Sequence, residues 1–223
     1  MDSLNHLTSP PQLLALAAAL GWASGIRLYA AVFLTGVAGY LGWIDLPQGL
    51  QMLQHPGVMA ASGGMLFVEF FADKIPLVDT VWDAIHTFIR IPAGAALAAG
   101  ALGADSTAMG WIGALLGGSL AATSHAAKMT TRAAVNTSPE PFSNIAVSLA
   151  EDGFVVFMLW LSATHPLLFA LALGLTLVIA VTLMVVLVKF LRVVLRGLRR
   201  LISGEGLPLG KRDVQQDPDR QPR

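Results

Sequence analysis

Leu167–Val188 reads LLFALALGLTLVIAVTLMVVLV, a run of 22 residues without a charged side chain. As an α-helix it is about 33 Å long, which is enough to cross the hydrocarbon core of a bilayer. Lys189 ends the run, and nine of the 14 Lys and Arg residues of the chain lie at or after this position. Because positive residues beside a span favour the cytoplasmic side, the sequence predicts a terminal span over 167–188 and a cytoplasmic C-terminus.

The residues after this span change in character. Residues 190–202 mix Leu, Val and Arg at helical spacing, which predicts an amphipathic extension at the membrane surface. Residues 203–223 are rich in Gly, Pro, Gln, Asp and Arg, which predicts a disordered cytoplasmic tail. Basic tails also bind nucleic acid, but a cluster directly after an apolar run favours a role in membrane orientation. We therefore expect the lipid bilayer, and no nucleic acid, as a partner.

The composition agrees with a polytopic membrane protein. Hydrophobic residues make up 55% of the 223 residues and charged residues only 13%, whereas soluble domains have about 25% charged residues. We predict an all-α fold with a single transmembrane domain over 13–202, preceded by a tail over 1–12. That tail contains no Lys or Arg, so it does not resemble a cleaved secretory signal. The absence of cysteine excludes disulfides and thiolate-bound metals.

The first apolar stretch, Leu13–Ile44, is too long for one simple span and contains the polar interruption Ser24-Gly25-Ile26-Arg27. Two interpretations fit: a tilted helix with a polar kink, or two half-helices over 13–23 and 27–43. We favour the broken form. Broken helices expose backbone groups, which membranes tolerate only around a cavity lined by protein. The stretch therefore predicts a polar site.

A second stretch, Ala108–Val135, shows the same organisation. Its apolar part, Trp111–Ala122, is interrupted by Thr123-Ser124-His125. An apolar segment that carries acids follows each interruption, first over 57–72 and then over 144–161. This weak twofold pattern resembles the inverted repeats of transporters. It predicts broken or re-entrant helices in two related halves, about 13–103 and 108–163.

Polar residues four positions apart form stripes on three of the expected helices, because such residues are axial neighbours. The stripes are Ser124, Lys128, Arg132 and Asn136; Asn144, Ser148 and Asp152; and Glu69 and Asp73 with the adjacent Lys74. Buried charges are expensive in hydrocarbon, so we expect the stripes to face one another and to form ion pairs, with Arg27 joining them.

This arrangement predicts a charged site near the membrane midplane. Arginine suits oxyanions because its planar fork grips two oxygens at once. The predicted substrate-binding residues are Ser24, Arg27, Ser124, His125, Lys128, Arg132 and Asn136. The predicted charge-compensating or proton-coupling residues are Glu69, Asp73, Lys74, Glu151 and Asp152. The competing interpretation is a neutral network of ion pairs that only fixes helix packing.

An amphipathic helix is predicted over Val78–Arg90, with Pro76 and Pro92 as its boundaries and a short membrane segment over 93–103 after it. Its secondary polar face comprises Asp79, Asp83, His86 and Arg90, and it either lies at the interface or lines the polar interior. One histidine with two carboxylates is a weak metal signature, so we expect no metal and no cofactor. Patterns such as Gly21-x-x-x-Gly25 allow close helix contact, including contact between copies in a homo-oligomer.

Several motifs resemble one family. They are Ala23-Ser-Gly-Ile-Arg27, the segment Glu69–Asp79, the segment Val81–Arg90 and the segment Asn136–Asn144. Over roughly 13–161 the chain resembles the bacterial integral-membrane family known as domain of unknown function 4126. The resemblance implies a polytopic protein of the bacterial inner membrane and transfers no catalytic residue, since the family name records no activity.

The leading functional hypothesis is a small transporter or translocase for an anionic solute or a lipid headgroup, with proton coupling through the carboxylates. An ion channel is the first alternative, and a membrane scaffold or assembly factor without transport is the second. An intramembrane enzyme is the weakest alternative, since only the carboxylates and His125 support it. We therefore do not expect catalysis.

Overall fold

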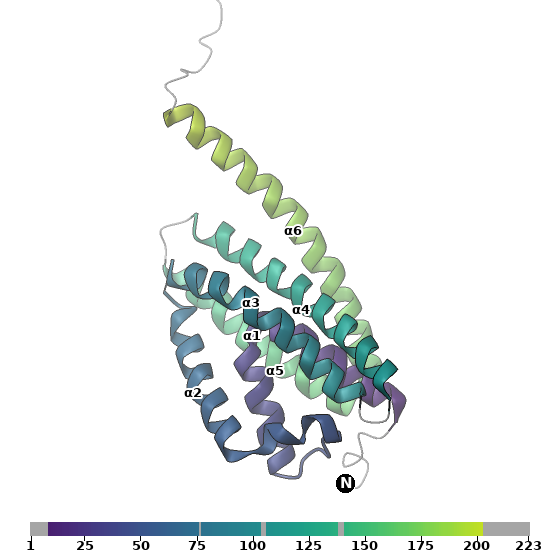
Figure 1. The fold of residues 1–223 in the computed structure, drawn as a ribbon. Helices are drawn as coiled ribbons and strands as arrows, with labels where there is room; N and C mark the ends of the chain where they lie inside the picture. The colour runs from purple at the N-terminus through teal and green to yellow at the C-terminus, as the bar shows by residue number, and fades with distance from the viewer. Residues whose placement is uncertain (1–8, 76, 104–105, 138–140, 203–223) are drawn as a thin grey trace, which may run out of the picture.

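The computed structural model describes residues 9–75, 77–103, 106–137 and 141–202. Within these ranges the chain consists of helices and turns, without a strand, which confirms the predicted all-α class (Figure 1). In chain order the elements are α1 (Pro10–Tyr40), the 3₁₀-helix η1 (Gln48–Gln54), α2 (Pro56–Ala72), α3 (Val78–Leu102), α4 (Thr107–Val135), α5 (Pro141–Thr164) and α6 (Pro166–Ile202).

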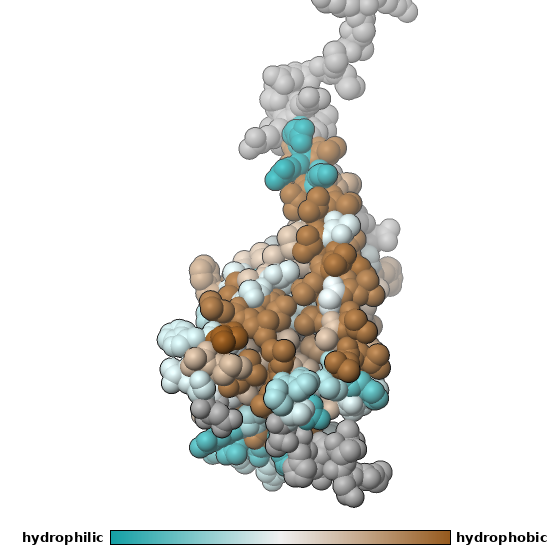
Figure 2. Space-filling model, turned by 90° about the vertical axis from the view of Figure 1, so that its right-hand side faces the viewer, coloured by the Kyte–Doolittle hydropathy of each residue, from teal (hydrophilic) through white to brown (hydrophobic). Residues whose placement is uncertain are grey.

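Four described helices are long and apolar enough to cross a bilayer. They are α1, α3, the Phe142–Thr164 part of α5 and the Pro166–Val193 part of α6. The predicted span over 167–188 lies inside α6 and continues without interruption to Ile202. At 37 residues, α6 is about 55 Å long and extends past the other helices (Figure 1). Figure 2 shows apolar side chains along this helix and hydrophilic ones towards its far end. The predicted tail over 203–223 lies outside the described residues.

Helix α1 is interrupted at Arg27, whose backbone angles are φ −141° and ψ 74°. This residue ends the predicted polar interruption, so the sequence located the break correctly. The two arms of α1 run in different directions, and the bend is visible in Figure 1. The first arm lies in the centre of the fold, where the residues from Ala15 to Gly25 are all buried.

Glycines let three helices approach one another closely. A Cβ atom added at Gly21 of α1 would lie 2.5 Å from the Cα atom of Gly117 in α4. A Cβ atom at Gly94 of α3 would lie 2.7 Å from the Cβ atom of Ala121 and 3.2 Å from the carbonyl oxygen of Gly21. Small residues therefore serve contacts within this chain, which bring α1, α3 and α4 together.

The prediction of a helix end at Pro92 is wrong, since α3 runs without a break from Val78 to Leu102. An interior proline removes one backbone hydrogen bond and costs about 3 kcal/mol. The contacts just beyond it offset this loss: Gly94 meets α1 and α4, and Ala98 is fully buried where Gly113 of α4 approaches α3. Tertiary packing thus carries the helix through the proline, and the predicted separate segment over 93–103 is its second half.

The prediction of a break at Thr123-Ser124-His125 is also wrong, because α4 is one helix from Thr107 to Val135. The hydroxyl of Thr123 donates to the Ser119 carbonyl over 2.8 Å. The hydroxyl of Ser124 donates to the Trp22 carbonyl of α1 over 2.8 Å. Because hydroxyls can bond to carbonyls of their own or a neighbouring helix, a polar run need not interrupt an α-helix.

Candidate functional site

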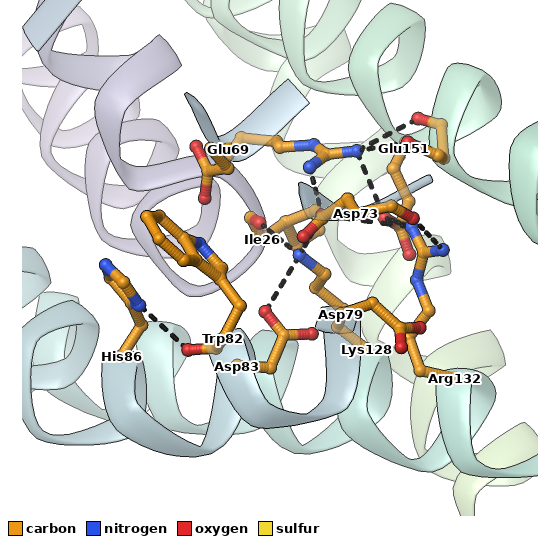
Figure 3. A network of polar contacts seen from close by, with 12 residues as sticks. Ile26, Glu69, Asp73, Asp79, Trp82, Asp83, His86, Lys128, Arg132 and Glu151 are labelled. Atoms are coloured by element: carbon orange, nitrogen blue, oxygen red, sulfur yellow. Dashed lines mark hydrogen bonds and ion pairs between the residues drawn. The ribbon is translucent and has the colours of Figure 1, made fainter. Parts of the chain in front are cut away.

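Ionic side chains from five helices and one turn meet in the interior, in what we call the ionic cluster. Its members are Arg27 of α1, Glu69 of α2, Asp73 and Lys74 of the α2–α3 turn, Asp83 and Arg90 of α3, Lys128 and Arg132 of α4, and Glu151 and Asp152 of α5. Figure 3 shows most of them pointing towards one another. The predicted stripes therefore do face each other.

Asp73 is the central acid of the cluster. One of its carboxylate oxygens contacts Arg27 and lies 2.5 Å from Nζ of Lys128. Its backbone carbonyl accepts a hydrogen bond from Arg132 over 3.0 Å. The residue is the C-cap of α2, where the helix dipole places partial negative charge. The end of α2 and the Asp73 side chain therefore attract the cations of α1 and α4 together.

The charge of Asp73 is stabilised by these neighbours. Burial by itself disfavours a carboxylate, but the charges of Lys128 and Arg27 outweigh that effect and hold the pKa of Asp73 below its ordinary value. The acid therefore stays ionised inside the protein.

Arg27 joins Asp73 to α5. Its Nε lies 2.7 Å from a carboxylate oxygen of Asp152, and its Nη2 lies 3.6 Å from one of Glu151. Nη2 also donates to the Ser148 hydroxyl over 2.9 Å. Since Arg27 occupies the break of α1, the irregular backbone and the charged site coincide in one residue.

Arg132 lies between Glu151 of α5 and the neutral side chain of Asn144. Its Nη2 is 2.6 Å from Glu151, and its Nη1 donates to the side-chain oxygen of Asn144. Both Nη atoms of the guanidinium are thus paired with acceptors in this state.

The secondary polar face of α3 is divided. Asp83 and Arg90 belong to the ionic cluster, because Asp83 lies 2.8 Å from Arg90 and 3.0 Å from Lys128. Arg90 also reaches Glu69 at 2.6 Å. The sequence pattern placed the acids and cations of α3 on one face but did not connect them to α2 and α4. All four residues of this face are buried, so the face lines the interior.

Asp79 and His86 lie beside the cluster and form other contacts. Asp79 accepts hydrogen bonds from the Asn136 side chain over 3.1 Å, so Asn136 lies next to this acid. The ring of His86 stacks on Trp82 and contacts the Tyr29 hydroxyl over 3.1 Å. Within the described ranges, no three His, Asp or Glu side chains are arranged to hold a metal ion.

Three predicted binding residues contact backbone. Ser24 donates to Leu20 within α1 over 2.6 Å, and Ser124 donates to Trp22. His125 contacts the Gly25 carbonyl over 3.1 Å and the Thr87 hydroxyl over 2.7 Å. Ser124 thus links α4 to α1, whereas Ser24 bonds within α1, and neither hydroxyl bonds to an acid of the cluster. Sequence reasoning missed Thr87, because a single threonine on an amphipathic helix gives no signal.

Two backbone carbonyls just before the break face the cations. The Ile26 carbonyl accepts a hydrogen bond from Lys128 over 3.3 Å. The Gly25 carbonyl accepts one from Arg90 over 3.5 Å and also contacts His125. The break in α1 therefore supplies acceptors as well as the Arg27 side chain.

Three ionic side chains of the cluster are partly exposed. The side chains of Lys74, Glu151 and Asp152 are 16%, 15% and 23% exposed. The remaining ionic side chains of the cluster are at most 1% exposed. The accessible charges of the cluster thus lie on α5 and in the α2–α3 turn.

The fold and this cluster define an all-helical protein with several potential membrane spans and a buried ionic site. The family described as "Domain of unknown function (DUF4126)" matches residues 14–186, and the chain belongs to this family. The comparison with curated proteins and the comparison with solved structures found no match.

Proposed function

We propose that this protein is a small membrane transporter or translocase whose ionic cluster takes an anionic solute or a lipid headgroup. The observation that carries the proposal is the coincidence of the break in α1 with a cluster of buried cations around Asp73. Transporters commonly place discontinuous helices at their substrate and ion sites. Ionic residues of this number inside apolar helices are costly, and they generally mark a transported or titrating species.

Unsatisfied polar atoms give the proposal a second support. Glu69 Oε2, Asp73 Oδ1 and Asp83 Oδ2 are buried and have no hydrogen-bond partner among the described residues of the protein, and the same holds for the Nε atoms of Arg90 and Arg132. A network that served only stability would be expected to satisfy every member, since a half-satisfied network is worse than an apolar core. These atoms offer bonding capacity to water or to a bound polar group.

In the proposed cycle, an oxyanion approaches from the exposed side and competes with Glu151 for the fork of Arg132. Glu151 suits this exchange, because it is 15% exposed and lies 2.6 Å from Arg132. Once separated from the guanidinium, the carboxylate of Glu151 is left without its nearest cation. Substrate binding would then be coupled to the opening of the Arg132–Glu151 ion pair, and the carboxylates of the cluster are the groups proposed to carry the coupling proton.

The proposal includes a topology. The C-terminus lies in the cytoplasm of a bacterium, the protein resides in the inner membrane, and the halves 13–103 and 108–163 are related as an inverted repeat with re-entrant segments. The break in α1 has no counterpart in the continuous α4. The repeat therefore concerns the order of the helices and the positions of their acids.

A membrane scaffold without transport is the second candidate. One observation favours it: each cation of the cluster has an acid within 4.0 Å in this state. Such pairing also fits a resting state of a transporter, so the two candidates differ in what happens when a cation is removed.

The test is transport into liposomes containing the purified chain. Uptake of radiolabelled inorganic phosphate and of glycerol phosphate is followed together with an internal pH dye. Arg132→Gln is compared with Arg192→Gln on the exposed part of α6, a matched loss of charge outside the cluster. We expect saturable uptake that falls at least about tenfold in Arg132→Gln, the loss of one charge-assisted contact, and is unchanged in Arg192→Gln. Full uptake by Arg132→Gln would reject the site, flux without saturation would indicate a channel, and no uptake by the unmodified chain would favour the scaffold.

A further inference from the structure

The ionic cluster adjoins a second opening, between α4, α5 and α6. A cavity of about 340 Å³ reaches from the surface to Lys128 and Glu151, with Ser124 beside them. Its remaining wall is mostly apolar and includes Ile179, Ala180 and Leu183 of α6. Volumes of this order are typical of pockets that bind small molecules. We call it the lateral groove.

The position of the lateral groove on α6 indicates what it faces. Ile179 and Leu183 lie near the middle of the apolar segment Pro166–Val193 and are 48% and 49% exposed. Figure 2 views the molecule from the side of α6 and shows this helix covered with apolar side chains. In a membrane, the mouth of the groove would therefore open to the acyl chains of the bilayer, at a depth where water does not compete.

The inner end of the groove carries one positive and one negative side chain. Lys128 is held by Asp73 and Asp83, and Glu151 is held by Arg132, so the two groups are fixed in place. Each charge is already paired within the cluster, so the inner end of the groove carries little net charge and a headgroup with a single negative charge gains little attraction. A headgroup that carries both charges complements them, with its oxyanion towards the lysine and its ammonium towards the carboxylate.

We propose that the lateral groove binds a zwitterionic phospholipid whose headgroup carries a primary ammonium. Its phosphate faces Lys128, its ammonium faces Glu151, and one acyl chain lies along Ile179 and Leu183. This inference rests on the proposed function and names the substrate class of the same site, reached from the bilayer instead of from the aqueous side. The two parts of the lipid match the two parts of the groove, because the wall is apolar where the chain lies and charged where the headgroup lies.

The full-length chain is tested by native mass spectrometry in detergent, with phosphatidylethanolamine and phosphatidylglycerol titrated in separate and in mixed samples. Ala180→Trp fills the groove from α6 and replaces no ionic residue. Ala170→Trp, on an exposed part of the same helix, is the matched control. Glu151→Gln removes the proposed ammonium partner and leaves Lys128 in place.

We expect one tightly retained phosphatidylethanolamine, preferred over phosphatidylglycerol by at least about fivefold, the worth of one partly exposed ion pair. Ala180→Trp should abolish this retention and Ala170→Trp should preserve it. Glu151→Gln should reverse the preference towards phosphatidylglycerol. Equal retention of both lipids, a preference for phosphatidylglycerol in the unmodified chain, or equal effects of the two tryptophans would overturn the proposal.

These results are separable from the transport experiment, because retention is measured without flux. If Ala180→Trp abolishes retention but leaves uptake of phosphate unchanged, the lipid does not share the transport site and the inference fails while the proposed function stands. If retention and its headgroup preference are found in a chain that moves no solute, the lipid site stands and solute transport fails.

Discussion

Nζ of Lys128 lies 2.5 Å from a carboxylate oxygen of Asp73, although 55 positions separate the two residues in the chain. Lys128 belongs to α4 and Asp73 ends α2, and the same carboxylate also contacts Arg27 of α1. One acid therefore connects three elements.

Asp73→Asn should destabilise the fold by about 3–5 kcal/mol, because it leaves Lys128 and Arg27 buried with too little negative charge. The measurement is thermal unfolding in detergent. Asp152→Asn is the matched control, since Asp152 is 23% exposed and water can replace part of its contribution. Equal losses in the two variants would contradict the central place of Asp73.

The double replacement of Asp73 by Leu and Lys128 by Met tests whether the pair serves structure or function. Replacing a buried ion pair by apolar residues is often neutral for stability. We expect the double variant to unfold closer to the unmodified chain than Asp73→Asn does, and to lose uptake of phosphate. A double variant that is stable and fully active would assign the pair to helix packing alone.

Low pH should remove the contribution of Asp73. Its pKa in the folded protein lies below the ordinary value of 3.8, so the unfolded chain binds a proton first as pH falls. The stabilisation is complete above 3.8 and is lost as pH falls through the folded value. The difference in unfolding temperature between the unmodified chain and Asp73→Asn should therefore be constant near neutral pH and shrink in strong acid. A difference in unfolding temperature that grows in acid would contradict this prediction.

Arg27→Lys keeps the charge and removes the fork. A lysine cannot reach Asp73, Asp152 and the Ser148 hydroxyl at once. We expect a loss of about 1.5–3 kcal/mol, that of one charged hydrogen bond. Arg196→Lys, an exposed exchange on α6, should change stability by less than about 0.5 kcal/mol. Chemical unfolding of both variants in one detergent gives the comparison.

Gly21→Ala should disrupt the crossing of α1 and α4. The new Cβ atom would lie 2.5 Å from the Cα atom of Gly117 and 2.9 Å from its carbonyl oxygen, so backbone would have to move. We expect a loss of about 1–3 kcal/mol. Gly174→Ala on α6 meets no atom within 4 Å and should be neutral or stabilising by up to about 1 kcal/mol.

The sequence predicted which residues form the site better than it predicted which of them pair with one another. Helical spacing identified the stripe of Lys128 and Arg132, and the cost of a charge in hydrocarbon required it to turn inwards. Spacing describes one helix at a time, so it could not show that Arg90 and Asp83 of α3 join Glu69 and Lys128 in the same cluster. That information lies in the crossing of helices at small residues.

Of the interruptions expected at Arg27, Pro92 and Ser124, only the first occurs, for a reason common to all three. The chain bends at Arg27, where the side chain and two carbonyls gain ionic partners. It stays helical at Pro92 and at Ser124, where close packing and hydroxyl–carbonyl bonds offset the local loss. A polar residue or a proline weakens the helix locally. The tertiary contacts around it decide whether the helix is interrupted there.

The backbone carbonyls of Gly25 and Ile26 accept hydrogen bonds from the side chains of Arg90 and Lys128, respectively. No side-chain replacement deletes a carbonyl, so an alanine scan of this region would overlook part of what anchors the cations. Only a change that makes α1 regularly helical at Arg27 would remove those acceptors. Arg90 of α3 and Lys128 of α4 would then lose their backbone hydrogen bonds together. The backbone conformation at Arg27 is thus a component of the site that amino-acid substitutions can alter only indirectly.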